Sequence, residues 1–330
     1  MEQELLGLTD PAAIARAFED VARVVMGVPV SGGLFYASSA GTVCGLVLAD
    51  GRRIVVKASR DLHPAAVLGA VRDVQAALAA GGFPAPPPLA GPVPFGRGLA
   101  VIDGYRPGGV ADAHDPAVRD AMARTLAALV REGGAILAER RRDLAVLALE
   151  RRPGRPAPGA LWGVPHSPIF DLAATHAGAE WIDAVARPAQ AVVADPAGER
   201  VLGHIDWSVK NLGWDGASAV AVYDWDSLAV AAEPVILGEA ARGFTATWEL
   251  PVEPAPSPEE AAAFVRAYEV ARGAPFSSAE RRTAAAAALY AAAGIARFEH
   301  ALTPWPAEYP RGSFRDRLAR HGADWFDFGG

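Results

Sequence analysis

One stretch of the sequence combines two acids and an amide in an order that suits phosphoryl transfer. Asp206 and Asn211 lie in GHIDWSVKNL, and Asp224 follows in AVYDWDS. Transfer of a phosphoryl group to a hydroxyl needs a carboxylate that orients the hydroxyl and accepts its proton. It also needs oxygen ligands, such as an amide and a second carboxylate, for metal ions that neutralise the phosphate. The three side chains match these tasks, so the segment predicts a phosphoryl-transfer site.

The complete pattern, HxDxxxxN followed by an apolar run and DWD, resembles the aminoglycoside phosphotransferase and choline kinase group of the protein-kinase-like fold. The resemblance implies that Asp206 is the catalytic base and that His204 braces the catalytic loop. It also implies that Asn211 and Asp224 bind Mg²⁺. Asp226 is either a further metal ligand or a structural residue. The alternative to a catalytic site is a hairpin whose buried polar residues only hydrogen-bond with one another.

Two lysines stand out because they are the only ones in the chain. Lys57 ends RIVVK, where the resembling family places the lysine that holds the α- and β-phosphates of ATP. In that family a glutamate on the following helix pairs with this lysine, yet Val71 occupies the expected position. Asp73 lies two residues further on and faces mostly elsewhere, whereas Gln75 shares the inward helix face with Val71. Lys210 replaces a small residue of the family pattern. It is either a solvent-facing side chain or a positive charge for the γ-phosphate.

Two further segments resemble nucleotide-binding parts of the family. The turn with Ser38, Ser39 and Gly41 would cover the phosphates with backbone N–H groups and hydroxyls, although such a turn is often only a hairpin loop. The strand that reaches Asp103 and Tyr105 resembles the linker whose backbone groups bind adenine. The implied cofactors are therefore ATP and Mg²⁺.

The region before this linker has the pattern of a β-rich lobe. Asp10 as N-cap and Pro11 at the first helical position predict a helix to about residue 26. Alternating apolar and aromatic runs separated by Gly-rich turns predict three antiparallel strands. A second helix is expected over residues 64–80. The predicted strands are residues 28–37, 42–49 and 52–59.

The proline-rich segment 83–94 is expected to be a stiff connector without strand pairing, followed by a strand at residues 98–105. We place the lobe boundary after Asp103. Residues 1–103 would form a nucleotide-binding lobe and residues 104–330 a mostly helical catalytic and acceptor-binding lobe, which is an α+β fold. VLGHID and AVAVYDWD are expected to form a hairpin around Asp215 and Gly216. The helices expected in the second lobe are residues 116–130, 136–149, 172–193, 258–272 and 278–300.

Composition excludes several classes of protein. The chain of 330 residues is 51% hydrophobic and 21% charged, which is ordinary for globular proteins. A formal net charge of −7 argues against nucleic-acid binding, and the single Cys44 excludes an intramolecular disulfide. The N-terminal residues lack the pattern of a secretory signal, and the apolar run 284–296 is too short to cross a membrane. We therefore expect a cytoplasmic protein; its oligomeric state stays open.

The acceptor is less determined than the reaction. The resemblance allows an aminoglycoside, an amino alcohol or a sugar-like compound. Acidic residues would suit a polycation, or they would be solvated surface: these are Glu233, Glu239, Glu249, Glu253, Glu259 and Glu260. Aromatic and histidine side chains would line an acceptor pocket or belong to the core: these are Trp162, His166, Phe170, Trp181 and Trp248.

Two other functions compete with a kinase. A pseudokinase-like protein would bind nucleotide or another ligand without transfer, which the missing helical glutamate favours and the Asp206, Asn211 and Asp224 set disfavours. A metal hydrolase would use His204, Asp206 and Asp224 as ligands. The other histidines lack metal-ligand spacing, which disfavours the hydrolase.

Overall fold

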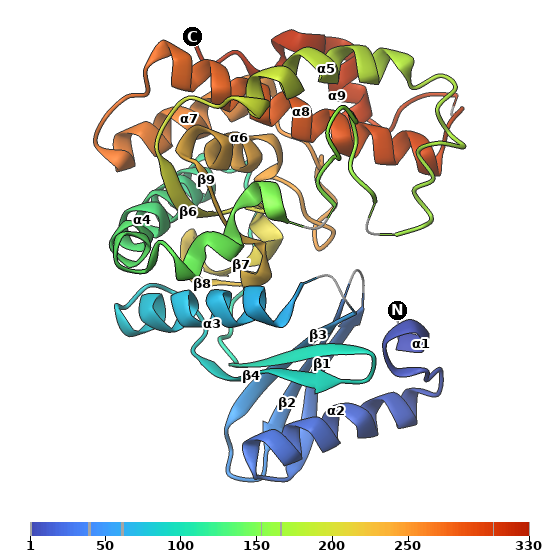
Figure 1. The fold of residues 1–330 in the computed structure, drawn as a ribbon, viewed down its shortest axis with the longest axis vertical. Coiled ribbons are helices and arrows are strands. Elements are labelled where there is room, and N and C mark those ends of the chain that lie inside the picture. Colours follow the sequence, from blue (N-terminus) through green and yellow to red (C-terminus); the bar gives the residue numbers. More distant parts are fainter. Residues whose placement is uncertain are drawn as a thin grey trace. The chain divides into compact units, whose positions relative to one another are not determined.

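The computed structural model describes residues 2–38, 41–60, 63–152, 154–165, 167–305 and 307–329. The chain forms two compact units, Met1–Pro107 and Gly108–Gly330. The first contains a five-stranded antiparallel sheet with helices, and the second is mostly helical (Figure 1). The predicted α+β class is therefore confirmed, while the roles assigned to residues 1–103 and 104–330 stay predictions.

The sheet of the first unit has the strand order β1-β2-β3-β5-β4, with neighbouring strands antiparallel. Asp50 and Gly51 form the tight turn between β2 and β3, where Gly51 has a φ of 84°. Glycine adopts this conformation without steric cost. The strand bounds are Val30–Ser38 (β1), Thr42–Leu48 (β2), Arg53–Ser59 (β3), Pro88–Phe95 (β4) and Gly98–Gly104 (β5).

Helix α2 (Pro11–Met26) packs along one face of this sheet, as Figure 1 shows. Asp10 caps it by accepting backbone hydrogen bonds from Ala12 and Ala13. Phe18 and Ala22 of this helix are fully buried against the sheet. The unit also contains α1 (Glu2–Leu6), which the sequence did not suggest, and α3 (Ala65–Ala80).

The proline-rich segment 83–94 was expected to be a connector without strand pairing. This expectation was wrong, because β4 occupies most of the segment and ends at Phe95. This strand pairs with β5 alone and therefore forms an edge of the sheet. An edge strand needs backbone donors on one side only, so Pro88, Pro92 and Pro94 are tolerated there. The pairing is irregular around the cis bond between Gly91 and Pro92.

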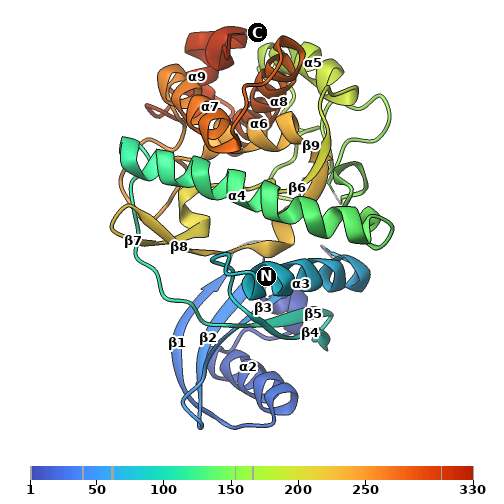
Figure 2. The ribbon, with the colours of Figure 1, turned by 90° about the vertical axis from the view of Figure 1, so that its left-hand side faces the viewer.

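Long helices dominate the second unit. Helix α4 runs beside β6 and α7 (Figure 2), and α8 packs against α5 and α6. The helix bounds are Pro116–Arg140 (α4), Glu180–Ala194 (α5), Glu233–Gly243 (α6), Pro258–Arg272 (α7), Ser278–Leu302 (α8) and Phe314–His321 (α9). Short 3₁₀ helices cover Asp143–Leu147 (η1), Leu149–Arg151 (η2), Val209–Asn211 (η3), Trp225–Ser227 (η4) and Gly322–Phe326 (η5). No helix among the described residues is long and apolar enough to cross a membrane.

Two helix predictions differ from the structure. A break was expected between residues 130 and 136, yet α4 continues through Gly133 and Gly134 to Arg140. The helix expected to run to residue 149 ends there, and two 3₁₀ helices follow. Gly133 is buried, and an added Cβ there would lie 3.0 Å from the Leu202 Cβ, so Leu202 would have to shift by a few tenths of an ångström. The close packing of α4 on β6 therefore favours glycine at this position. The helix expected from residue 172 begins only at Glu180.

Two small sheets position the motif residues, and their pairing corrects the sequence-based hairpin. Strand β6 (Arg200–His204) pairs with β9 (Leu228–Ala232), whereas β7 (Leu212–Asp215) pairs with β8 (Ser218–Val222). VLGHID and AVAVYDWD therefore do not pair with each other. The turn at Asp215 and Gly216 is present, but it joins β7 to β8.

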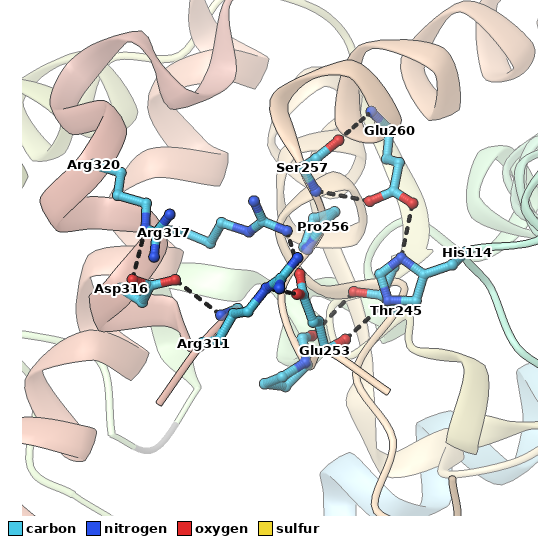
Figure 3. Close-up of polar contacts among 12 residues, drawn as sticks. His114, Thr245, Glu253, Pro256, Ser257, Glu260, Arg311, Asp316, Arg317 and Arg320 are labelled. Atoms are coloured by element: carbon cyan, nitrogen blue, oxygen red, sulfur yellow. Dashed lines mark hydrogen bonds and ion pairs between the residues drawn. The ribbon is translucent and has the colours of Figure 1, made fainter. Parts of the chain in front are cut away.

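A polar cluster fixes the segment between α6 and α7 (Figure 3). Glu253 accepts hydrogen bonds from Arg311 and Arg317, and its backbone carbonyl lies 2.9 Å from His114 Nε2. The His114 Nδ1 lies 2.7 Å from Glu260 Oε1. His114 thereby ties this segment to the start of α7.

We expect Gly238→Ala to destabilise the protein. An added Cβ at Gly238 in α6 would lie 2.4 Å from the backbone oxygen of Ala284 in α8. Backbone cannot move aside cheaply, so the free energy of unfolding should fall by about 1–3 kcal/mol. Gly134→Ala is the matched control, because nothing lies within 4 Å of its added Cβ. The control should be neutral or raise stability by up to about 1 kcal/mol. Thermal unfolding measures both, and an unchanged Tm for Gly238→Ala would contradict the packing.

His114 should stabilise the protein in a pH-dependent way. The hydrogen bond to Glu260 raises the pKa of His114 to about 9, above its usual value of 6.5. A raised pKa stabilises the fold fully below pH 6.5, and this contribution is lost as the pH rises through 9. We expect His114→Gln to cost about 1–3 kcal/mol near pH 6 and clearly less near pH 9.5. Unfolding curves of the two proteins across this range provide the measurement.

The Glu260→Gln background is the control for His114. There the pH dependence of the His114→Gln effect should largely disappear, because the partner charge is gone. The exposed His176→Gln serves as a second control for the loss of a histidine. A stability gap between wild type and His114→Gln that stays constant with pH would refute the assignment.

Candidate active site

The Asp206 carboxylate is the centre of the candidate site. It follows β6, and its Oδ2 accepts hydrogen bonds from Lys210 Nζ at 3.0 Å and Asn211 Nδ2 at 2.9 Å. The Arg242 Nη2 lies 3.8 Å from Oδ1. Burial opposes ionisation, but Lys210 and Arg242 outweigh it and hold the pKa of Asp206 below its usual value. Asp206 is therefore an ionised carboxylate at neutral pH.

His204 joins two parts of the site from the end of β6. Its ring is fully buried; Nδ1 accepts the backbone N–H of Asp206 at 3.2 Å, and Nε2 lies 3.1 Å from the carbonyl of Tyr223. This pairing makes Nε2 the protonated nitrogen of a neutral ring. Burial lowers the pKa of His204, which favours the neutral form. The ring thus links the segment of Asp206 to the segment before Asp224.

Asn211 is oriented by two hydrogen bonds at the same place. Its Nδ2 donates to the backbone carbonyl of Asp206 at 2.8 Å as well as to the carboxylate. Because the amide nitrogen is engaged, Oδ1 is the atom that can ligate a metal ion. The Asn211 backbone carbonyl accepts the Tyr223 N–H at 2.8 Å, which returns the chain from β8 to the loop of Asp206 and Asn211. The predicted proximity of Asp224 to Asp206 and Asn211 has this origin.

Asp224 adopts a backbone conformation that non-glycine residues rarely use. Its φ is 59° and its ψ is 43°, in the left-handed region. Ser227 stabilises the turn: its N–H donates to the Asp224 carbonyl at 2.9 Å and its hydroxyl to Oδ2 at 3.2 Å. Strained conformations of this kind cluster at functional sites. The turn redirects the chain immediately before Asp226.

Arg152, which directly follows η2, supports this turn and was not foreseen. The residue is 7% exposed, and its guanidinium donates through Nη2 to the backbone carbonyl of Asp226. Burial lowers the pKa of Arg152, and the charge of Asp226 counteracts this effect. In the sequence, the stretch ERRPGR around Arg152 gives no sign of a tertiary partner.

The donor chemistry fits a hard divalent cation. An amide oxygen from Asn211 and carboxylates from Asp224 and Asp226 are ligands that Mg²⁺ accepts, with water and phosphate completing its shell. Within the described part of the chain, no group of three or more His, Cys, Asp or Glu side chains is arranged to hold a metal ion.

Arg242 on α6 is a second residue that sequence reasoning missed, and its partner Glu239, also on α6, was considered only as an acid for a polycationic acceptor. Arg242 contacts Asp206, and its Nε lies 3.6 Å from Glu239 Oε2. Glu239 in turn lies 3.6 Å from Arg155. No spacing signal connects α6 with the catalytic loop, since 36 residues separate Asp206 from Arg242 (242 − 206). Only the fold reveals this chain of charges.

Lys57 lies in the first unit, in the middle of the sheet. Its register partners are Val43 on β2 and Val101 on β5. It alternates with the buried Val56, so its side chain lies on the face of the sheet opposite α2. On α3, Val71 is buried in place of the expected glutamate, and the buried Gln75 donates to the Pro86 carbonyl at 2.8 Å.

The turn predicted to cover the phosphates is described in part, since Ser39 lies outside the described residues. Ser38 ends β1, and its hydrogen bond is the main cause that lowers the pKa of Glu2 to about 2. Gly41 approaches β3 closely, because an added Cβ would lie 2.9 Å from the Ala58 carbonyl oxygen. The Ser38 hydroxyl is thus engaged with α1.

Asp103 and Tyr105 lie at the end of the sheet where β5 leaves it. Asp103 is paired in register with Val55. The Tyr105 N–H donates to the Arg53 carbonyl at 3.0 Å, and the Arg53 guanidinium lies 4.9 Å from the Tyr105 ring centroid. These contacts hold the segment predicted to bind adenine against β3.

Four of the six candidate acids of the second unit are paired with cations of their own unit. Glu233 accepts hydrogen bonds from Tyr268 and Arg272, both at 2.8 Å. Glu239, Glu253 and Glu260 have the arginine and histidine partners given above. Only Glu249 and Glu259 are exposed. The set is therefore poorly suited to receive a polycation.

The aromatic candidates separate into packed side chains and one at the candidate site. Trp162 stacks on Tyr290 with a centroid distance of 5.7 Å, and Trp181 stacks on Tyr309 at 6.4 Å. Phe170 stacks on Phe298, whereas His166 lies outside the described residues. Trp248 alone among the four described candidates contacts a motif residue, with Lys210 Nζ 4.9 Å from its ring centroid.

Comparison with known proteins identifies the family and the fold. Residues 45–276 match the model of a phosphotransferase enzyme family. Comparison with curated proteins gave no match.

Solved structures share the fold along nearly the whole chain. An amicoumacin kinase in complex with AMP-PNP, Ca²⁺ and Ami is 11% identical, with 97% of this chain and 99% of that chain covered and a TM-score of 0.63. A putative aminoglycoside phosphotransferase from Ralstonia eutropha JMP134 is 17% identical, with 94% and 96% covered and a TM-score of 0.56. An aminoglycoside phosphotransferase from Alicyclobacillus acidocaldarius is 14% identical, with 92% of each chain covered and a TM-score of 0.51.

At these identities the solved structures establish the kinase-like α+β fold, and the family model covers more than half of the chain. The chain therefore belongs to the phosphotransferase enzyme family.

Proposed function

We propose that the protein transfers the γ-phosphoryl group of ATP to a hydroxyl group of a small acceptor, with Asp206 as the catalytic base. The observation that supports this most directly is the ionised Asp206 carboxylate, held by Lys210 and Asn211 on the loop that also approaches Asp224. Membership of a phosphotransferase family supports the reaction class.

The two oxygens of Asp206 have different surroundings, which suggests how it acts. Oδ2 already accepts hydrogen bonds from Lys210 and Asn211. Oδ1 lies 3.8 Å from Arg242, which is beyond hydrogen-bond distance. We therefore assign Oδ1 to the acceptor hydroxyl. As the hydroxyl oxygen bonds to phosphorus, its proton passes to Oδ1 and the bond from phosphorus to the bridging oxygen of ADP breaks.

The buried His204 ring would keep the Asp206 carboxylate in place. Its Nδ1 holds the backbone N–H of Asp206, and its Nε2 faces Tyr223, next to Asp224. We propose His204 as the brace of the loop. Asn211 Oδ1 and the Asp224 carboxylate would hold Mg²⁺, with Asp226 as a further ligand or as support. Mg²⁺ bound there would neutralise charge on the transferred phosphate.

The first unit would bind the nucleotide. Lys57 is proposed to contact the α- and β-phosphates as a flexible point charge. The turn of Ser38, Ser39 and Gly41 would contribute backbone N–H groups. The hydrogen bond of Ser38 to Glu2 makes the backbone the better candidate than the hydroxyl. Adenine would meet the backbone near Asp103 and Tyr105.

Lys210 has a proposed role in the transfer step. Its side chain is 13% exposed and lies 3.0 Å from Asp206, so it is not a solvent-facing lysine. An ammonium so close to the base would also be close to the phosphoryl group that the acceptor attacks. We propose that Lys210 stabilises the negative charge of that group during transfer.

Asp206→Asn should abolish phosphoryl transfer, with a loss of kcat of about 10²–10⁴-fold, because the amide cannot accept the proton. ATP with Mg²⁺ should still raise the Tm of this variant. Coupled ADP release across a panel of hydroxyl acceptors measures the loss of transfer, and thermal unfolding measures the binding of ATP.

The exposed Asp215→Asn in the β7–β8 turn is the matched control and should retain activity. A fully active Asp206→Asn enzyme would refute the proposed base, whereas ATP binding without ADP release in wild type would favour a nucleotide-binding protein.

Lys210→Met should lower kcat about 10–100-fold with a smaller change in KM for ATP, because the proposed charge acts mainly in the transition state. Lys210→Arg keeps the charge and should recover part of the loss. Steady-state kinetics of the two variants distinguish this role from simple anchoring of the loop. Equal kcat values in wild type and Lys210→Met would contradict it.

A further inference from the structure

Trp248 is an exposed indole beside the candidate base. Of the eight tryptophans in the chain, only Trp248 and Trp305 are largely exposed, at 76% and 74%. Lys210 Nζ lies 4.9 Å from the Trp248 ring centroid and 3.0 Å from Asp206 Oδ2. The indole is therefore one side chain away from the proposed reacting group, with most of its surface in solvent.

The segment that carries Trp248 is held in place at several points. At its start, the Phe244 carbonyl accepts the Val209 N–H of the catalytic loop at 2.9 Å. The buried Thr245 donates to the Pro254 carbonyl at 3.0 Å, which closes the segment on itself. At its end, Glu253 is fixed by the polar cluster of Figure 3. These contacts anchor both ends of the segment, and Lys210 lies over the Trp248 ring, which lowers the entropy that the segment would lose when a ligand packs on it.

The charges around Trp248 indicate what such a ligand would be. Lys210, Arg242 and Arg155 are paired with the carboxylates of Asp206 and Glu239, so these charges largely compensate each other. Four of the six candidate acids of the unit are paired with cations in the same way. Compensated charges leave little net potential to attract a charged ligand. These contacts therefore favour a neutral acceptor over a polycation.

We propose that Trp248 is one face of the acceptor site and that the acceptor is a neutral glycoside. A sugar ring offers an apolar C–H face for the indole and, at its edge, hydroxyl groups for Asp206. Aromatic side chains combined with a few polar groups are the usual lining of small-molecule sites. This inference rests on the proposed kinase function, because Asp206 defines which end of the acceptor reacts. It makes Trp248 a specificity-determining residue.

Binding without nucleotide tests the inference separately from transfer. The probes are 4-nitrophenyl β-D-glucopyranoside and methyl β-D-glucopyranoside as neutral glycosides, with kanamycin as the polycation. Calorimetric titration into wild-type protein should show tighter binding of the glycosides than of kanamycin. Trp248→Ala should weaken glycoside binding about tenfold, and Trp248→Phe should weaken it less. Trp305→Ala is the matched control and should bind like wild type, because Trp305 contacts His300 at the end of α8.

The outcomes separate the two proposals. Unchanged glycoside affinity in Trp248→Ala, absence of glycoside binding by wild type, or tighter binding of kanamycin would each overturn the inference. None of these results depends on phosphoryl transfer. Conversely, loss of the proposed kinase function would appear as absent ADP release with glycoside binding intact. Thermal unfolding of Trp248→Ala at the wild-type Tm would show that its fold is retained.

Discussion

The rest of the second unit depends on compensating the negative charge of Asp206. A carboxylate withdrawn from water needs opposite charge and hydrogen bonds, or it takes up a proton. Lys210 and Asn211 supply these from the same loop, while Arg242 reaches it from α6. The position of α6 is therefore an electrostatic requirement of the site. Its close packing on α8 at Gly238, where no side chain fits, fixes that position.

The second acid of the site is held by backbone geometry. Asp224 lies in the left-handed region, which costs a non-glycine residue about 1–3 kcal/mol. The hydrogen bonds from Ser227 and the β7–β8 pairing offset this cost. Arg152 holds the following carbonyl of Asp226. The two acids are thus positioned by different means: Asp206 through its side-chain partners and Asp224 through a turn that its neighbours enforce.

Local patterns in the sequence predicted the parts of the fold that local physics determines. The Asp10 cap, the Asp50–Gly51 turn and the motif order all express interactions between residues close in the chain. The pairing of strands that are distant in the chain does not depend on such local interactions. For this reason the sequence-based hairpin gave β6 the wrong partner. Prolines were taken to exclude pairing, but an edge strand needs fewer donors. The sequence likewise gave no indication of Arg242, because its contact with Asp206 arises only when α6 packs beside the loop.

The two lysines show how residue type supports the proposed chemistry. All other basic side chains among the 31 are arginines, whose planar forks suit fixed ion pairs such as those of Glu253 and Glu233. An ammonium has three donors on a flexible stem and exchanges partners readily. Lys210 already lies between Asp206 and the Trp248 ring. The proposed role of Lys210, contact with Asp206 at rest and with phosphate during transfer, would need that freedom, and an arginine fork in the same place would hold Asp206 in one geometry.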